Sequence, residues 1–163
     1  MPDEVDRIIA AWRAEVPALD VEPLDVLSRV SRLSRHLDLA RREAFAAHDL
    51  EVWEFDVLAA LRREGPPYEL SPGALIQRTL STSGTMTNRI DRLEARGLVE
   101  RDRNPRDRRG VRVRLTTEGR HLVRAALADL LAYEQRVLDP LPSQERRTLA
   151  ELLRRLLAPF EDG

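Results

Sequence analysis

The sequence predicts a mainly α-helical protein with one small β-hairpin. Apolar residues recur at helical spacing over long stretches near both ends of the chain. One short stretch, residues 98–116, instead alternates between apolar and charged residues, which is typical of strands with one buried face. Aromatic residues make up 4% of the 163 residues, so we expect a core of Leu, Val, Ile and Ala in one domain or one two-lobed protomer.

Three helices are predicted before residue 65. They span residues 3–16, 23–47 and 51–63, and prolines or Gly65 follow the first and the third. The first two carry an apolar stripe on one side, which predicts amphipathic helices. The third is apolar nearly all round, which predicts that it is buried.

The middle of the chain predicts two short helices joined by a tight turn. Ser71 and Pro72 are a typical helix start, and that helix should end near residue 78. Residues 80–83 form the turn, where Ser81 or Thr82 can cap a second helix that runs to Arg96. Gly97 then ends the second helix.

A hairpin and two further helices complete the prediction. The strands are residues 98–103 and 111–116, and residues 104–110 form the tip between them. A long helix should follow over residues 119–138. Prolines break it, and Ser143 is expected to cap the last, leucine-rich helix.

The distribution of charge singles out residues 71–116. This stretch holds 11 arginines and 5 acidic residues, a net charge of +6, whereas the rest of the chain has a net charge of −7. All 27 basic residues are arginine, which binds phosphate groups in a bidentate manner. A basic module within an acidic chain is typical of binding to a phosphate backbone.

The second of the two short helices has a polar face suited to reading DNA. On a helical wheel Met86, Ile90 and Leu93 cluster on one side. The opposite side carries short hydrogen-bonding groups and arginines, at Thr85, Asn88, Arg92 and Arg96. Such side chains contact base edges in a major groove, so the sequence predicts a helix-turn-helix, although a plain amphipathic helix is the alternative.

The hairpin predicts a basic wing beside this helix. We expect Arg108 and Arg109 at its tip to contact DNA, because a projecting basic ribbon can enter a minor groove. From the helix we expect Thr85, Asn88 and Arg92 to contact bases or phosphates, with Ser83 and Thr87 near the backbone. Asp107 organises the wing arginines, or is an ordinary turn-forming aspartate.

These motifs resemble the MarR family of winged helix-turn-helix regulators. The resemblance is carried by residues 91–101, by the run Asp-Arg-Arg-Gly at 107–110 and by residues 115–119. It implies a single domain over residues 1–163, with a helical dimerisation lobe (3–47 and 119–160) and a winged helix-turn-helix lobe (50–116). It also implies a homodimer that binds a palindromic site in double-stranded DNA, most often as a repressor.

A second set of motifs resembles the PecS-type branch of this family, which responds to urate and related purines. The first helix with Trp12, the run 54–58 and the run 83–89 carry this resemblance. A carboxylate in the buried third helix needs a cation, and Asp56 and Arg89 are the candidates. We therefore expect a pocket in which Trp12 stacks on the ligand, Arg89 neutralises it and Asp56 accepts from its N–H groups.

The alternatives for the three ligand residues stay open. Trp12 can be a core residue, Asp56 a structural ion-pair partner and Arg89 a phosphate ligand. A regulator that answers to phenolic or other aromatic acids is the alternative effector class. A winged helix that binds another protein instead of DNA is a third possibility.

Other classes of function find no support in the sequence. Cysteine is absent, and the three histidines stand apart without metal-ligand spacing, so we expect no metal and no cofactor. We find no nucleophile motif and no phosphate loop, which argues against an enzyme. The chain lacks a signal peptide and an apolar run of membrane-spanning length, so we expect a cytoplasmic protein without membrane contact.

Overall fold

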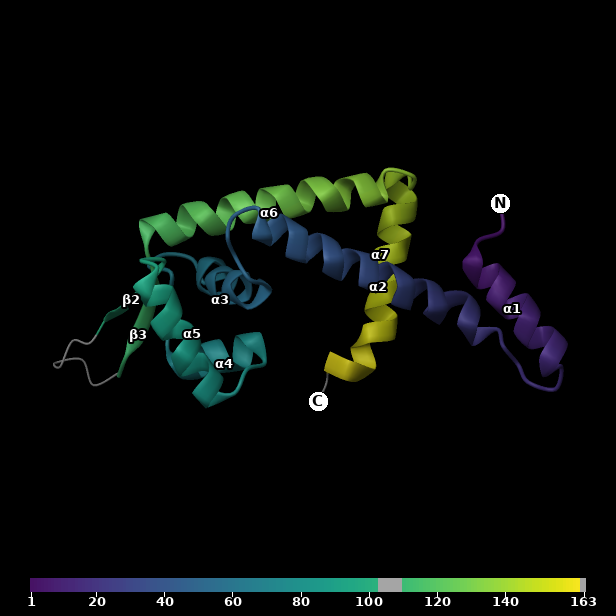
Figure 1. Cartoon of the computed structure of the whole chain (residues 1–163), viewed down its shortest axis with the longest axis horizontal. Helices are drawn as coiled ribbons and strands as arrows, with labels where there is room; N and C mark the ends of the chain where they lie inside the picture. The colour runs from purple at the N-terminus through teal and green to yellow at the C-terminus, as the bar shows by residue number, and fades with distance from the viewer. Residues whose placement is uncertain (103–109, 162–163) are drawn as a thin grey trace. The chain divides into compact units, whose positions relative to one another are not determined.

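The computed structural model describes residues 1–102 and 110–161 (Figure 1). It divides into two compact units, Met1–Val52 and Trp53–Gly163. The first unit contains two helices, α1 (Glu4–Glu15) and α2 (Pro23–Ala46). The second contains the remaining elements: α3 (Val52–Arg63, which begins at the boundary), β1 (Glu69–Leu70), α4 (Pro72–Thr79), α5 (Ser83–Ala95), β2 (Val99–Asp102), β3 (Arg112–Leu115), α6 (Thr117–Leu138) and α7 (Ser143–Glu161).

A cluster of charges joins the two helices of the first unit. Asp3 caps α1, and its side chain and that of Asp6 form a capping box. From α2, Arg29 donates to Asp3 at 2.9 Å and to Asp6 at 2.7 Å, and it also pairs with Asp25. The backbone N–H of Asp6 and the Arg29 guanidinium hold the pKa of the Asp3 carboxyl below its usual value. The carboxylates of Asp3 and Asp6 raise the pKa of Arg29.

The core of the second unit is built on α3. Phe55, Val57, Leu58, Ala60 and Leu61 are all buried there, as the nearly continuous apolar run predicted. Against this core lie the inward faces of α4 and α5, with Leu75 from α4 and Met86, Ile90 and Leu93 from α5.

The turn between α4 and α5 has the form that the sequence predicted. The Ser71 side chain accepts from the Ala74 N–H at the start of α4. Leu80 closes α4 in the left-handed region at φ 50°, and Thr82 caps α5 by accepting from the Thr85 N–H. Of the two expected caps, Thr82 is therefore the one used.

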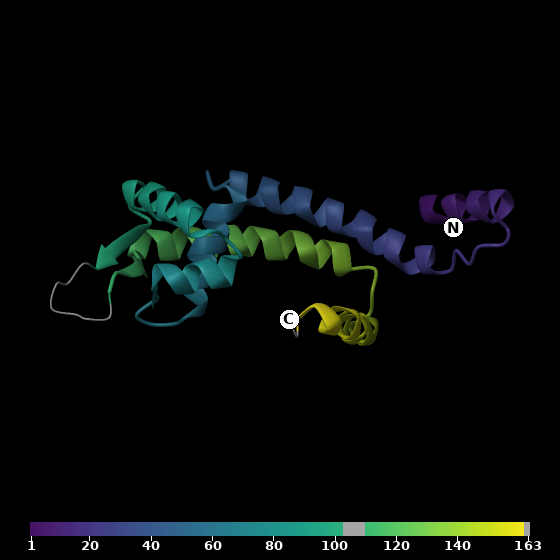
Figure 2. The ribbon, with the colours of Figure 1, turned by 90° about the horizontal axis from the view of Figure 1, so that it is seen from below.

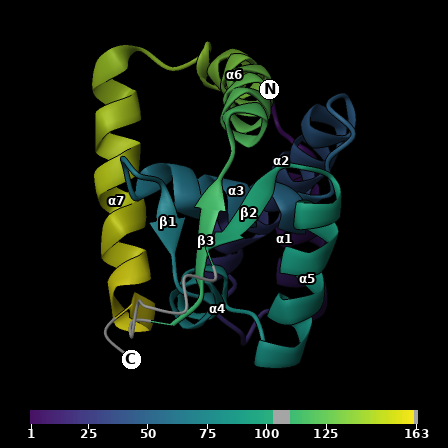
Figure 3. The same ribbon diagram turned by 90° about the vertical axis from the view of Figure 1, so that its left-hand side faces the viewer.

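A three-stranded antiparallel sheet is formed by β1, which precedes the helix-turn-helix, and by β2 and β3, which follow it (Figure 3). Its strand order is β1-β3-β2, with Val99 opposite Leu115 and Asp102 opposite Arg112. Val113 and Leu115 are buried, whereas Arg112 and Arg114, which alternate with them along β3, are half-buried, so the predicted alternation is confirmed. Strand β1 was not predicted, because two residues are too few to show an alternating pattern.

Helix α6 continues directly from β3 (Figure 2). It begins at Thr117 with Thr116 as its cap, two residues earlier than predicted. Gly119 lies in the first turn, and a Cβ there would lie 2.2 Å from the carbonyl oxygen of Leu98 and 2.8 Å from Leu115 Cδ1. The close approach of α6 to the sheet therefore requires glycine at this position.

Helix α7 has no buried residue in the structure. Its leucine stripe is exposed, and so is part of the apolar face of α2. The exposed side chains are Leu149, Leu152, Leu156, Leu157 and Phe160 on α7 and Val26, Leu27, Val30, Leu33 and Leu39 on α2. Within the described ranges, each helix is too short or too polar to cross a membrane.

Substitution of Gly119 by alanine should destabilise the fold. The added methyl group meets backbone at Leu98, so the free energy of unfolding should fall by about 1–3 kcal/mol. Urea denaturation followed by circular dichroism measures the change. Gly73→Ala is the matched control, because a Cβ there has its nearest neighbour at 3.9 Å and alanine favours a helix. Equal stability of the two variants would contradict this account of the α6 packing.

Candidate nucleic-acid interface

The exposed face of α5 begins with hydroxyl and amide side chains. Ser83, Thr85, Thr87 and Asn88 are all exposed. Thr82 Oγ1 donates to Thr85 Oγ1 at 2.8 Å, and Thr87 Oγ1 donates to the Ser83 carbonyl oxygen at 3.3 Å. This end of the helix also presents the positive end of the helix dipole. The result is a polar surface of short donors and acceptors, as the helical wheel predicted.

Two arginines on the flank of α5 contact an aromatic ring of α3. The guanidinium carbon of Arg89 lies 5.3 Å from the centroid of the Trp53 ring, and that of Arg92 lies 4.8 Å from it. Arg89 also donates to Ser81 Oγ at 2.5 Å. Arg89 is half-buried, in agreement with its predicted position between the polar and apolar faces.

The buried carboxylate of α3 is Glu54, not Asp56. Glu54 is 2% exposed and accepts from Arg96 Nη1 through both carboxylate oxygens, each at 2.8 Å. Arg96 is exposed, as the helical wheel predicted, but its guanidinium turns toward α3 and not away from it with the predicted DNA-facing side chains. Arg96 is the C-cap residue of α5, where the helix is ending, so its side chain can turn toward α3. Asp56 is half-buried.

Several arginines of the basic module are neutralised by acidic neighbours. Arg101 Nη1 donates to Glu94 at 2.7 Å, and the same guanidinium pairs with Asp91. On the sheet Arg114 donates to Glu69 at 2.9 Å, which raises the pKa of Arg114. Asp91 and Glu94 are already counted in the net charge of +6, whereas Glu69 lies outside residues 71–116 and offsets one more of its arginines.

Most of the predicted wing tip, residues 104–110, falls within the stretch 103–109. Arg108 and Arg109, expected to contact DNA, and Asp107, expected to organise them, lie outside the described residues. The strands that lead to the tip are described, and β2 and β3 pair as a hairpin requires. The assignment of these three residues stays a prediction.

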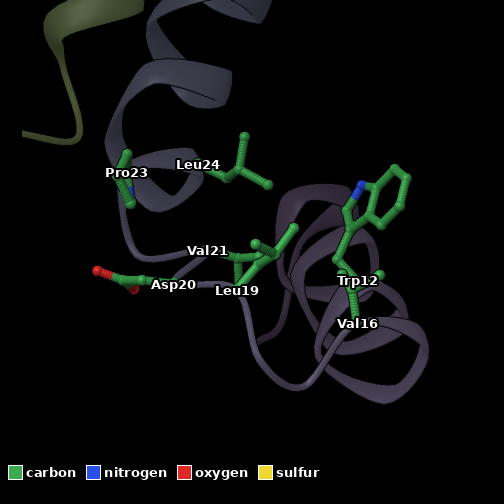
Figure 4. A pocket seen from close by; sticks show the side chains of 7 residues that line it. All are labelled: Trp12, Val16, Leu19, Asp20, Val21, Pro23 and Leu24. Carbon is green, nitrogen blue, oxygen red and sulfur yellow. The ribbon is translucent and has the colours of Figure 1, made fainter.

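Trp12 lines an apolar pocket of about 380 Å³ in the first unit (Figure 4). Pro23 and Leu24 from the start of α2 line it too, together with Val16, Leu19 and Val21 from the connection between the two helices. Asp20 is the charged residue of the lining, and its carboxylate accepts from the Glu22 N–H at 3.0 Å. Trp12 is 50% exposed, so its interpretation as a core residue is wrong.

The three predicted ligand residues are divided between the two units. Trp12 belongs to Met1–Val52, and Asp56 and Arg89 belong to Trp53–Gly163. Arg89 contacts Trp53 and Ser81 within its own unit. A pocket that contains all three residues therefore stays a prediction. Sequence reasoning missed Trp53 and Glu54, although an indole and a carboxylate in an otherwise apolar helix were the signal that could have found them.

Comparisons with known proteins agree on one family. A family model described as MarR family matches residues 48–110. The transcriptional regulator PecS of Dickeya dadantii is 39% identical over 94% of this chain and 92% of PecS. The transcriptional repressor NicR of Pseudomonas putida is 32% identical over 89% of this chain and 92% of NicR.

The solved structures support the same fold. Wild-type MarR of Escherichia coli in its apo form is 29% identical, with a TM-score of 0.65 over 80% of this chain and 96% of MarR. A MarR family protein from Bacillus stearothermophilus has a TM-score of 0.73 over 87% of this chain and 98% of that protein. The predicted fold class, mainly α with a small β-wing, is confirmed.

Substitution of Arg96 by alanine should destabilise the second unit. It leaves the Glu54 carboxylate buried without its bidentate partner, and breaking such a pair costs about 3 kcal/mol. Thermal unfolding followed by circular dichroism measures the loss. The double variant Glu54→Leu, Arg96→Leu removes both charges, so it should recover much of the stability. If Arg96→Ala is as stable as the parent protein, the ion pair does not hold the end of α5.

Proposed function

This chain belongs to the MarR family of transcriptional regulators, which are not enzymes, and from that premise we propose a finer function for it. We propose that it is a homodimeric repressor that acts in the cytoplasm, binds a palindromic operator and is released from it by a small aromatic ligand. The observation that carries the proposal is the exposed start of α5, where hydroxyl and amide groups stand on one face of a winged helix-turn-helix.

The chemistry of this face suits a major groove. Asn88 can form two hydrogen bonds with an adenine edge, and Thr85 can donate to a base or contact a thymine methyl group. Ser83 and Thr87 can contact phosphates beside the start of the helix, where the dipole favours anions. Arg92 is exposed and can reach a base or a phosphate from the same helix.

The wing supplies the second contact in this proposal. Arg108 and Arg109 enter a minor groove next to the recognition helix, which is α5, and Asp107 orients their guanidinium groups. The pairing of Arg101 and Arg114 with acidic neighbours supports this division, because it leaves DNA contact to arginines nearer the tip.

The exposed apolar stripes support a homodimer. A stripe of leucines on α7 and another on α2 would meet water in a lone chain, and contiguous apolar surface of this kind marks an interaction site. We assign residues 3–47 and 119–160 to a helical dimerisation lobe and residues 50–116 to the DNA-binding lobe. A symmetric dimer then places two recognition helices in successive major grooves, about one helical turn apart.

Urate or a related purine is the proposed effector. Trp12 offers a half-exposed indole next to an apolar pocket, which suits a flat ring, and Arg89 offers a cation for an anionic ligand. Asp56 would accept from ring N–H groups. Phenolic and other aromatic acids share the flat ring and the negative charge but lack those N–H groups, so they are the alternative ligands.

Asn88→Ala should weaken operator binding about tenfold or more and leave nonspecific binding nearly unchanged, because a base contact is lost. Arg109→Ala should weaken binding to all duplexes and reduce its salt dependence. Fluorescence anisotropy with the DNA upstream of the gene and with a scrambled duplex, each over a salt series, measures both effects. Arg124→Ala removes the same charge from α6 and serves as the control. If both variants bind DNA as tightly as the parent protein, the assignment of α5 and the wing to DNA contact is contradicted.

Urate should release the protein from its operator. The affinity falls only if urate binds the DNA-free state more tightly than the DNA-bound state. Titration of urate, xanthine and salicylate into the preformed complex, followed by anisotropy, compares the effector classes. Arg89→Ala should abolish the response to urate. Unchanged DNA affinity at millimolar urate would remove urate as the effector, and a response to salicylate alone would favour the aromatic acids.

A further inference from the structure

We propose that Trp53 is a positioning residue for the recognition helix. Its indole holds Arg89 and Arg92 against α3 and so sets the rotation of α5 about its own axis. The consequence for DNA binding rests on the function proposed above, whereas the contact itself can be tested without DNA.

The geometry places two cations on one ring. Arg89 and Arg92 are three residues apart, so their side chains emerge on the same side of α5. Their guanidinium carbons lie 5.3 Å and 4.8 Å from the Trp53 centroid, both within the 6 Å range over which a cation is attracted to a ring. Tryptophan is the most effective aromatic side chain for this contact.

Neighbouring contacts extend this arrangement to both ends of α5. Near the start of the helix, Arg89 donates to Ser81 Oγ in the turn, and Ser81 Oγ lies 3.0 Å from Thr79 Oγ1 at the end of α4. At the other end, Arg96 pairs with Glu54, the residue next to Trp53. Two adjacent side chains at the start of α3 therefore contact arginines along the second half of the recognition helix.

These contacts supply what the apolar face of α5 cannot. Met86, Ile90 and Leu93 bury one face of the helix, but the hydrophobic effect that drives this burial is not directional. A ring and two guanidinium groups have a preferred relative position. A cation–π contact is made by the charge of the Arg92 guanidinium and does not use up its N–H donors, which a phosphate or a base can accept from. Trp53 thus presents Arg92 to the duplex in a fixed position.

The variants Trp53→Leu and Trp53→Phe separate the effect of the aromatic ring from the effect of apolar side-chain volume. Leucine keeps apolar volume but has no ring, whereas phenylalanine keeps a weaker ring. In the free protein, we expect amide hydrogen exchange across residues 83–95 to accelerate in Trp53→Leu and to stay close to the parent rate in Trp53→Phe. Unchanged exchange in Trp53→Leu would overturn the proposal, whatever the protein does with DNA.

On DNA, Trp53→Leu should lower affinity for the operator by about 5- to 30-fold, from the loss of two cation–π contacts. Affinity for a scrambled duplex should change little, and Trp53→Phe should retain most of the operator affinity. Arg92→Leu added to Trp53→Leu should cost less than Arg92→Leu alone, because Arg92 is then no longer held in place. An equal loss on both duplexes, or additive losses, would reduce Trp53 to a general stabilising residue.

Hydrogen exchange and DNA binding together distinguish a failure of the Trp53 proposal from a failure of the proposed function. If the parent protein binds neither duplex, the function proposed above fails, and the hydrogen exchange of α5 still decides the role of Trp53. If the parent protein binds the operator and Trp53→Leu binds it equally well, DNA binding stands and the positioning role falls.

Discussion

A carboxylate that is removed from water needs a cation, and at Glu54 this constraint fixes the position of the C-terminal end of α5 against α3. Arg96, at the C-terminal end of α5, supplies this cation, with its Nη1 atom 2.8 Å from each Glu54 carboxylate oxygen. The helix therefore cannot slide along α3 without leaving a buried charge unpaired. Apolar packing of α5 supplies most of the burial, but it does not specify a register. The ion pair and the ring of Trp53 supply the directional contacts that a reading surface requires.

Arginine therefore performs two kinds of work in this molecule. Arg96, Arg101 and Arg114 hold helices and strands together through acidic partners inside the second unit. Other positions are proposed to meet phosphate groups. A planar guanidinium suits both tasks, because it binds carboxylate and phosphate in the same bidentate geometry and stacks on rings. The excess of arginine in residues 71–116 thus reflects internal organisation as well as binding to a polyanion.

The apolar faces of α2 and α7 are exposed in the single chain and require a partner to cover them. Helix α7 buries no residue and α2 exposes much of its apolar face, so neither is stabilised mainly by its own chain. A partner that covers both faces would stabilise them by removing apolar surface from water, at roughly 25 cal/mol per Å². In a homodimer this stabilisation and the spacing of two recognition helices arise from one interface, which links folding to operator geometry.

The sequence by itself determined the elements: the helices, the cap at Ser71, the hairpin and the exposed polar face of α5, while it left Ser81 and Thr82 as alternative caps of α5. These follow from local periodicity and capping, which act over a few residues. The tertiary structure alone decided which charges meet. Asp56 and Glu54 are two residues apart in one helix, and periodicity could not tell which of the two carboxylates is buried. Strand β1, the Trp53 contacts and the need for glycine at position 119 arise between segments that are distant in the chain. Pairings over such separations depend on packing in three dimensions, which no pattern of neighbouring residues records.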